Sequence, residues 1–224
     1  MSKYLFAQIA AGLAVFNWLA VALKWKWLEY IAKPAIMLAL IAFVWRLRPG
    51  LVIHGNINWL LFALFFSLAG DIFLMLPRNL FLPGLVSFLL AHIAYIFALS
   101  LTLPSFDLAV LLVILMVGLT SFQIYRRVAG GLEISGQTEM KIPIILYTSV
   151  ISVMVIFALL TLVSNDIENY RALLLSAGAL LFFISDTWIA WDRFVEPLKF
   201  RDLRVMVSYH IAQICLCLGF LVSP

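Results

Sequence analysis

Eight long apolar runs limit what this sequence can fold into. Each contains about 20 residues, the length that an α-helix needs to cross the hydrocarbon core of a bilayer. Charged residues, prolines and aromatic residues separate the runs, which fall at 4–22, 29–45, 59–77, 82–100, 106–125, 142–163, 171–190 and 204–222. The sequence therefore predicts an all-α integral membrane protein with eight transmembrane helices.

The composition argues against a soluble domain. Of the 224 residues, 65% are hydrophobic and only 12% are charged, whereas an average soluble domain has about 25% charged residues. The apolar runs leave only short loops, so we expect one transmembrane domain over residues 1–224. The small net charge of +4 reflects basic loops and does not indicate a nucleic-acid partner.

The basic residues are distributed unevenly between the two sides of the predicted bundle. The odd-numbered loops contain ten Lys and Arg residues, whereas the termini and the even-numbered loops contain four. Under the positive-inside rule, the odd-numbered loops are cytoplasmic and both termini lie outside the cytoplasm. We expect a multi-pass protein of a cell membrane, such as the bacterial inner membrane.

Matching motifs indicate two repeated halves of four helices each, 1–105 and 106–224. The matches are Lys33-Pro34 with Lys141-Ile142-Pro143, Gly70-Asp71 with Ser185-Asp186, and His92-Ile93-Ala94-Tyr95 with His210-Ile211-Ala212-Gln213. Equivalent residues are 109, 115 and 118 positions apart. Because each half has an even number of helices, both would have one orientation, as in a parallel repeat about the membrane normal.

Two aspartates are the strongest candidates for catalysis. An Asp at membrane depth costs at least about 2.5–3.5 kcal/mol, so its presence needs an explanation. Asp71 and Asp186 lie about six and four residues before the predicted cytoplasmic ends of their helices, roughly 6–9 Å deep. At matched depth, one can act as a general acid and the other as a base. The alternative is that both are hydrogen-bond anchors between helices.

Other polar residues lie on nearby helix faces. Lys33 can reach the interface or pair with Glu29, one turn before it. The candidates for substrate binding or support are Lys33, His92, Tyr95, Tyr147, Ser185, Arg193, Tyr209 and Gln213. For most of them, packing between helices is the competing interpretation.

Arg193 is a candidate for binding a phosphate. It follows Asp186 by seven residues, which is two helical turns and about 10 Å toward the cytoplasm. A guanidinium suits a phosphate because it can donate two parallel hydrogen bonds. The alternative is an ordinary positive-inside charge.

A zinc site is a further alternative. Its ligands would have to come from Asp71, Asp186, His92 and His210, because His54 falls in an outer loop. The two usable histidines are expected at different depths, so we predict no metal and no organic cofactor.

Several motifs together resemble the YhhN-like lysoplasmalogenase family. They are Gly70-Asp71-Ile72-Phe73-Leu74, Phe81-x-x-Gly84-x-x-x-Phe88-x-x-x-His92-x-x-Tyr95, Pro143-x-x-x-Tyr147, Gly178-Ala179-x-x-Phe182-x-x-Ser185-Asp186-x-x-x-Ala190-x-x-Arg193-Phe194, and Tyr209-x-x-Ala212-Gln213. The resemblance implies an eight-helix hydrolase that cleaves the vinyl ether bond of lysoplasmalogens to a fatty aldehyde and a glycerophospho-base. It also implies that Asp71 and Asp186 are the essential aspartates.

The expected substrate is therefore a lysophospholipid that enters from the inner leaflet of the membrane. A proton-coupled transporter or a lipid-binding protein is the rival interpretation, since acidic residues in parallel repeats also occur in carriers. A carrier needs access from both sides, yet the polar residues gather in the predicted cytoplasmic half. This asymmetry favours the enzyme, whereas an intramembrane zinc-dependent lipid hydrolase is the further alternative.

Overall fold

The structure is a computed structural model that describes residues 4–48, 56–100, 106–164 and 166–221. Within these residues, eight helices are long and apolar enough to cross a membrane, which confirms the predicted fold class. They are α1 (Leu5–Ala22), α2 (Lys26–Leu47), α3 (Asn56–Met75), α4 (Phe81–Leu99), α5 (Leu108–Ile134), α6 (Lys141–Leu160), α7 (Asn169–Phe194) and α8 (Arg201–Leu221), with a short 3-10 helix η3 (Thr138–Met140) before α6. His54 lies outside the described residues.

Some helices are longer than their apolar runs. The runs predicted ends near residues 125 and 190, whereas α5 continues to Ile134 and α7 to Phe194. Hydropathy marks where apolar residues stop, but a helix continues into water while its backbone hydrogen bonds are kept. As a result, Asp186 lies eight residues before the end of α7. Helix α3 instead ends at Met75, short of the predicted end at residue 77, so Asp71 lies four residues before its end.

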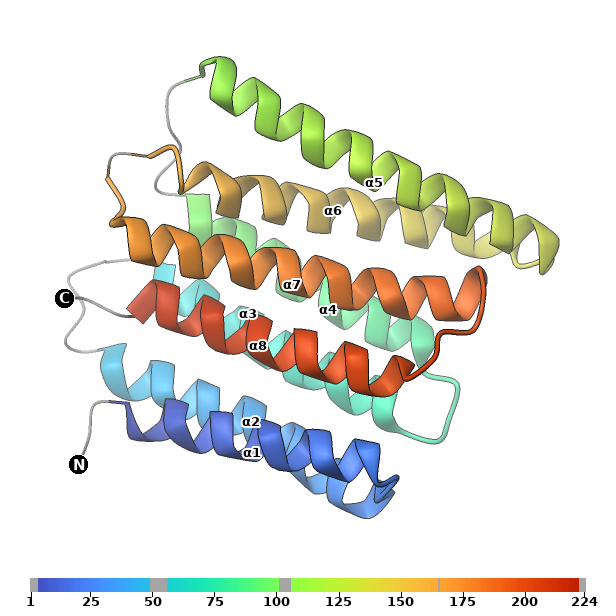
Figure 1. The fold of residues 1–224 in the computed structure, drawn as a ribbon, viewed down its shortest axis with the longest axis horizontal. Coiled ribbons are helices and arrows are strands. Elements are labelled where there is room, and N and C mark those ends of the chain that lie inside the picture. The colour runs from blue at the N-terminus through green and yellow to red at the C-terminus, as the bar shows by residue number, and fades with distance from the viewer. Residues whose placement is uncertain (1–3, 49–55, 101–105, 165, 222–224) are drawn as a thin grey trace.

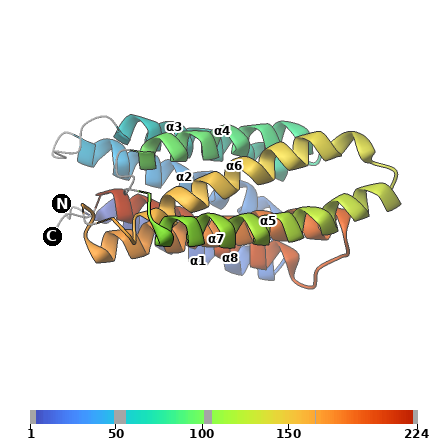
Figure 2. The same cartoon turned by 90° about the horizontal axis from the view of Figure 1, so that it is seen from above.

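The helices form a bundle in which sequential neighbours pack as hairpins. Helices α1 and α2, α3 and α4, and α7 and α8 make the most extensive contacts, and α8 also packs against α1 and α2. The start of α1 and the end of α8 lie at the same end of the bundle (Figure 1). Figure 2 shows α3 and α4 on one side of the bundle and α1, α7 and α8 on the other. Helix α5 lies at the edge.

Glycines allow α7 and α8 to approach closely. A Cβ atom added at Gly178 would lie 2.8 Å from Leu216, and one added at Gly219 would lie 2.7 Å from Leu175. Small residues at helix interfaces are typical of membrane bundles, where close van der Waals packing takes the place of the hydrophobic effect.

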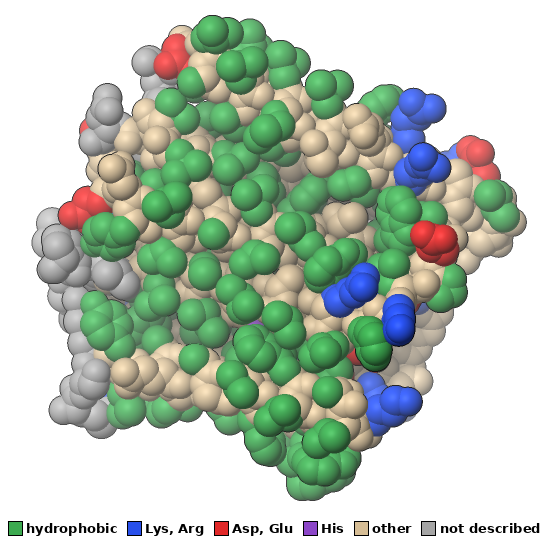
Figure 3. Space-filling model, viewed as in Figure 1, with side chains coloured by type: hydrophobic (Ala, Val, Ile, Leu, Met, Phe, Trp, Pro, Cys, Tyr) green, Lys and Arg blue, Asp and Glu red, His purple; other side chains and the backbone are tan. Residues whose placement is uncertain are grey.

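The surface is apolar in the middle and basic at one end. In Figure 3, hydrophobic side chains cover most of the visible face, and Lys and Arg side chains gather at the end opposite the start of α1. The odd-numbered loops lie at this end, and its cytoplasmic location stays a prediction. The 4+4 repeat and the division at residue 105 stay predictions.

Candidate active site

Asp71 is held in a buried ion pair. One carboxyl oxygen lies 3.1 Å from Nζ of Lys33, whose side chain is 5% exposed. The other accepts a hydrogen bond of 2.8 Å from the hydroxyl of Tyr209. The predicted pairing of Lys33 with Glu29, or its reach to the interface, is therefore wrong. Glu29 pairs instead with Lys26, at 3.0 Å, because Lys33 faces α3 inside the bundle.

Close packing of α3 against α4 shapes the surroundings of Asp71. A Cβ atom added at Gly70 would lie 2.6 Å from the ring of Phe88, and one at Gly84 would lie 2.5 Å from Leu74. Phe88 and Leu74 line the same polar cavity as Asp71. The glycine before Asp71 therefore has a structural reason, which is to admit an aromatic ring from α4.

Asp186 is held by partners from two other helices. Its Oδ2 accepts a hydrogen bond from the hydroxyl of Tyr147 on α6 and lies 3.1 Å from Nε2 of His92 on α4. The same nitrogen lies 3.0 Å from the Tyr147 hydroxyl. His92 and Tyr147, both candidates for substrate binding or support, thus contact a candidate catalytic carboxyl group directly.

The surroundings of His92 favour one neutral tautomer. The ring is fully buried, and its Nδ1 has no partner among the described residues. A proton on Nδ1 would be a buried donor without an acceptor, which is costly. A proton on Nε2 instead has Asp186 as its acceptor, so the contacts favour this one of the two neutral tautomers.

The two carboxyl groups line one polar cavity. It lies between α2, α3, α7 and α8, and its polar lining includes Lys33, Asp71, Ser185, Asp186 and Tyr209. Its volume is about 60 Å³, and a water molecule needs about 10–15 Å³. The cavity therefore has room for water between the two aspartates.

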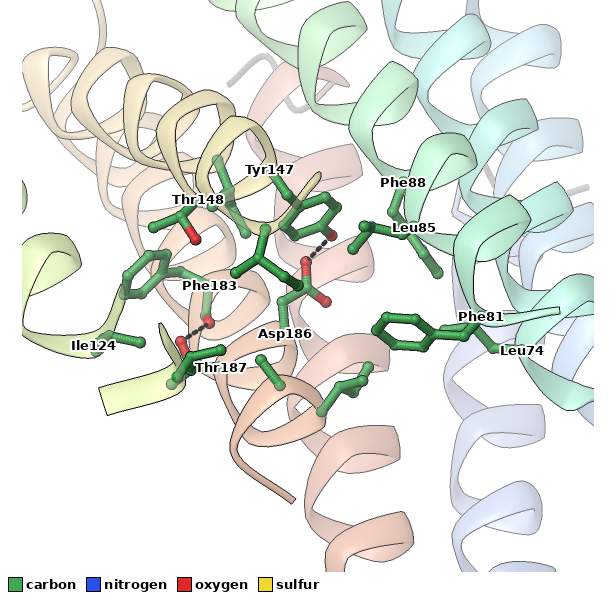
Figure 4. A pocket seen from close by; sticks show the side chains of 15 residues that line it. Leu74, Phe81, Leu85, Phe88, Ile124, Tyr147, Thr148, Phe183, Asp186 and Thr187 are labelled. Carbon is green, nitrogen blue, oxygen red and sulfur yellow. Dashed lines mark hydrogen bonds between the residues drawn. The ribbon is translucent and has the colours of Figure 1, made fainter. Parts of the chain in front are cut away.

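A second, apolar cavity begins at Asp186. It lies between α4, α5, α6 and α7, and Figure 4 shows Leu85, Ile124 and Phe183 among its walls. Asp186 and Phe88 line both cavities. This arrangement places one carboxyl group at the boundary between a polar space and an apolar space, whereas Asp71 lines only the polar one.

A basic cavity lies at the ends of α3 and α7. It is lined by Arg78, Asn79, Asp192, Arg193 and Arg201, together with Phe81 from the apolar cavity. The guanidinium of Arg193 lies 4.1 Å from the centre of the Phe81 ring and donates a 3.2 Å hydrogen bond to Asn79. Arg193 is therefore fixed near the mouth of the apolar cavity and not beside the aspartates.

Three of the candidate residues form hydrogen bonds outside the two aspartates: Tyr95 and Gln213 bond each other, and Ser185 bonds a backbone carbonyl. The Tyr95 hydroxyl donates a hydrogen bond of 2.5 Å to Gln213, and Gln213 donates one of 3.1 Å to Ser67. Neither Tyr95 nor Gln213 lines the polar or the apolar cavity. Ser185 lines the polar cavity, but its hydroxyl donates to the carbonyl of Val205.

The histidines that a zinc site would need are separated. The ring of His210 packs at 6.5 Å from that of Trp18 and accepts a hydrogen bond of 3.1 Å from its indole nitrogen. His92 is turned toward Asp186 instead. Among the described residues, no group of three His, Cys, Asp or Glu side chains has the geometry of a metal site.

Some lining residues were not singled out in the sequence. Leu74 and Ile189 line all three cavities, and Arg201 lines both the polar and the basic cavity. An apolar residue in an apolar helix, such as Leu74 or Ile189, has no sequence pattern that marks it as part of a site. Arg201 was one of several arginines expected in loops, and nothing in the sequence distinguished it from the others. Only contacts between distant helices identify them.

The chain was compared with known families and proteins. The model of the YhhN family matches residues 28–220, a range that includes both aspartates and all of their partners. This chain belongs to the YhhN family. The resemblance inferred from the motifs is thereby confirmed.

Named relatives cover most of the chain. It is 31% identical over 204 residues to lysoplasmalogenase TMEM86B of Rattus norvegicus, covering 89% of this chain and 76% of the relative. It is 29% identical over 203 residues to lysoplasmalogenase TMEM86B of Homo sapiens, covering 89% and 78%. A lysoplasmalogenase homolog of Dictyostelium discoideum is 28% identical over 188 residues, covering 70% and 61%. No solved structure matches the chain at a significant level.

Proposed function

We propose that this protein is a membrane hydrolase that cleaves the vinyl ether bond of lysoplasmalogens, with Asp71 and Asp186 as its catalytic residues. The observation that carries the proposal is the position of Asp186, which lines both a polar cavity shared with Asp71 and an apolar cavity. The names of the relatives support the same reaction.

The two carboxyl groups suit the chemistry of a vinyl ether. Hydrolysis begins with protonation of the β-carbon, and the resulting oxocarbenium ion is captured by water to form a hemiacetal. The hemiacetal then collapses to an aldehyde and an alcohol. A general acid and a carboxylate provide these steps, as in two-carboxylate glycosidases, whose transition state is also oxocarbenium-like.

The cavities correspond to the parts of a lysophospholipid. The single hydrocarbon chain would occupy the apolar cavity, where Tyr147, Thr148, Asp186 and Thr187 are the polar exceptions among mostly apolar walls. The phosphate would lie in the basic cavity near Arg193, whose donors are only partly used by Asn79. A groove between α5 and α7 shares Ile124, Phe183 and Thr187 with the apolar cavity. The hydrocarbon chain of the substrate would enter from the bilayer through this groove.

The site faces the basic end of the bundle. Under the positive-inside rule this end is cytoplasmic, so the substrate would come from the inner leaflet and both termini would lie outside the cytoplasm. We propose a bacterial inner membrane as the location.

The test is to incubate the purified protein with a lysoplasmalogen and with the matched ester lysophospholipid. Fatty aldehyde and free fatty acid are assayed separately. We expect aldehyde from the first substrate and no fatty acid from the second. Fatty acid release from the ester would indicate a general lysophospholipase, and transfer of unchanged lipid between vesicles without either product would favour the carrier.

A further inference from the structure

We infer that the two aspartates have fixed and different roles: Asp186 donates the proton to the vinyl ether, and Asp71 activates a water molecule held in the polar cavity. The inference rests on the proposed function and assigns the step that each residue performs. It is carried by the charges, by the partners of the four carboxyl oxygens, and by the position of each aspartate relative to the apolar cavity.

The charges favour one proton on the pair of carboxyl groups. Asp71 and Asp186 line the polar cavity, and Lys33 is the one buried Lys or Arg among its described lining residues. The other charged lining residues are paired, Arg201 with Asp202 and Glu29 with Lys26. Two carboxylates and one ammonium would bury a net negative charge, which is costly in a membrane bundle. One proton makes the group neutral, and Lys33 stabilises the carboxylate of Asp71, to which it is paired. The proton therefore belongs to Asp186.

The hydrogen-bond partners lead to the same assignment. Both oxygens of Asp71 have donors, from Lys33 and from Tyr209, as expected for a carboxylate. Only Oδ2 of Asp186 has partners, and none of the described residues bonds its Oδ1. Figure 4 shows one oxygen of Asp186 bonded to Tyr147 and the other directed away from it, toward Phe81. This second oxygen is free to carry the proton into the cavity.

The substrate has a matching polarity. In a vinyl ether, the β-carbon is attached to the hydrocarbon chain and the α-carbon to the ether oxygen of the headgroup side. With the chain in the apolar cavity, the β-carbon lies at the boundary where Asp186 is. The α-carbon then faces the polar cavity, where Asp71 and its water are.

The steps balance with these roles. The Oδ1 proton of Asp186 moves to the β-carbon, the C=C electrons form the new C–H bond, and positive charge appears on the α-carbon and ether oxygen. Water attacks the α-carbon and gives one proton to Asp71, which forms the hemiacetal. Asp186 then takes the hemiacetal hydroxyl proton, the bond from carbon to the ether oxygen breaks, and Asp71 protonates the departing alcohol. Both aspartates return to their initial states, and one water is consumed.

The neighbours of the aspartates are positioning residues. Tyr147 and His92 both contact Oδ2 of Asp186. The other oxygen, Oδ1, has no partner among the described residues and faces the substrate. Lys33 and Tyr209 keep Asp71 ionised and oriented, while the remaining lone pairs of its oxygens can accept a hydrogen bond from water.

Azide distinguishes the two roles because it is an anionic nucleophile that brings no proton. In Asp71→Ala, Lys33 loses its partner beside a space the size of a carboxylate, so azide can bind there and capture the cation without a base. In Asp186→Ala no cation forms, and azide has nothing to capture. The measured quantity is consumption of the vinyl ether, followed by mass spectrometry with and without sodium azide, with sodium nitrate as the control salt.

We expect each variant to lose about 10² or more of its rate, and azide to restore Asp71→Ala by about tenfold or more but not Asp186→Ala. Recovery of Asp186→Ala alone, of both variants or of neither overturns the assignment. Asp71→Gly replaces Asp71→Ala if the latter does not fold, and Asp166→Asn, an exposed site between α6 and α7, is the control for substitution of an aspartate. Lack of aldehyde from the wild-type protein would instead contradict the proposed function itself.

Discussion

Tyr95 and Gln213 are joined by a hydrogen bond of 2.5 Å across 118 positions of the chain. The same 118 positions separate His92 from His210, the offset that the sequence motifs indicate for the two halves. Residues related by a two-fold axis contact each other where the axis passes between them. The predicted repeat would therefore place its axis between Tyr95 on α4 and Gln213 on α8.

The partners of the aspartates follow the same correspondence. Asp71 on α3 is held by residues of α2 and α8, and Asp186 on α7 is held by residues of α6 and α4. Under the predicted repeat, α2 corresponds to α6 and α8 to α4. The predicted repeat would explain why two carboxyl groups face one cavity, and the differing partners would explain their proposed difference in role.

The bond between Tyr95 and Gln213 is expected to be structural. Tyr95→Phe leaves a buried amide oxygen without its donor, so the free energy of unfolding should fall by about 1–3 kcal/mol. The activity of the folded protein should change little, because Tyr95 does not line the cavities. Thermal unfolding in detergent and aldehyde release measure the two effects. Unchanged stability with lost activity would place Tyr95 in the chemistry.

The ion pair between Lys33 and Asp71 should be far more important for stability than the exposed pair at the start of the same helix. Lys33→Met leaves the carboxyl group of Asp71 buried without its cation and should cost about 3–5 kcal/mol. Lys26→Met breaks the ion pair with Glu29. Because the side chain of Lys26 is 64% exposed, this loss should cost about 0–1 kcal/mol. Thermal unfolding of both variants checks this, and equal effects would contradict the buried ion pair.

His92 is expected to act on the chemical step and not on substrate binding. Asp186 becomes a carboxylate as it gives up its proton, and the hydrogen bond from His92 then stabilises that charge. Hydrogen bonds to charged groups contribute about 1.5–3 kcal/mol, so His92→Phe should lower kcat by about 10- to 100-fold. KM should change little, since the ring contacts Asp186 and Tyr147 and lines neither cavity. His92→Gln, which keeps a donor, should recover part of kcat. A rise in KM alone would assign His92 to packing of the substrate cavity.

Arg193 is expected to bind the phosphate of the substrate. Arg193→Ala should raise KM more than it lowers kcat, because a distant binding contact is present in both the ground state and the transition state. Lys199→Ala is the matched control, since Lys199 lies in the loop that follows α7 but does not line the basic cavity. Steady-state kinetics with both variants provides the comparison. Equal small effects of the two substitutions would indicate that Arg193 is an ordinary positive-inside charge and does not bind the phosphate.

The sequence could predict the helices and the two aspartates but not the contacts of those aspartates. Apolar length determines a membrane helix locally, and a carboxyl group within such a run stands out against its neighbours. The pairing of Lys33 with Asp71 depends instead on how α2 packs against α3, which no local pattern encodes. The sequence also indicates the depth of His92, a candidate for substrate binding or support, but not the direction of its side chain toward α6 and α7.

The most direct test of the central claim is aldehyde release from lysoplasmalogen by the wild-type protein, Asp71→Asn, Asp186→Asn and the control Asp166→Asn. An amide keeps the size of each side chain and removes its proton chemistry, so both active-site variants should lose about 10² or more of the rate while remaining folded. The control should keep the wild-type rate. Near-normal release of aldehyde by either folded active-site variant would contradict the two-aspartate mechanism.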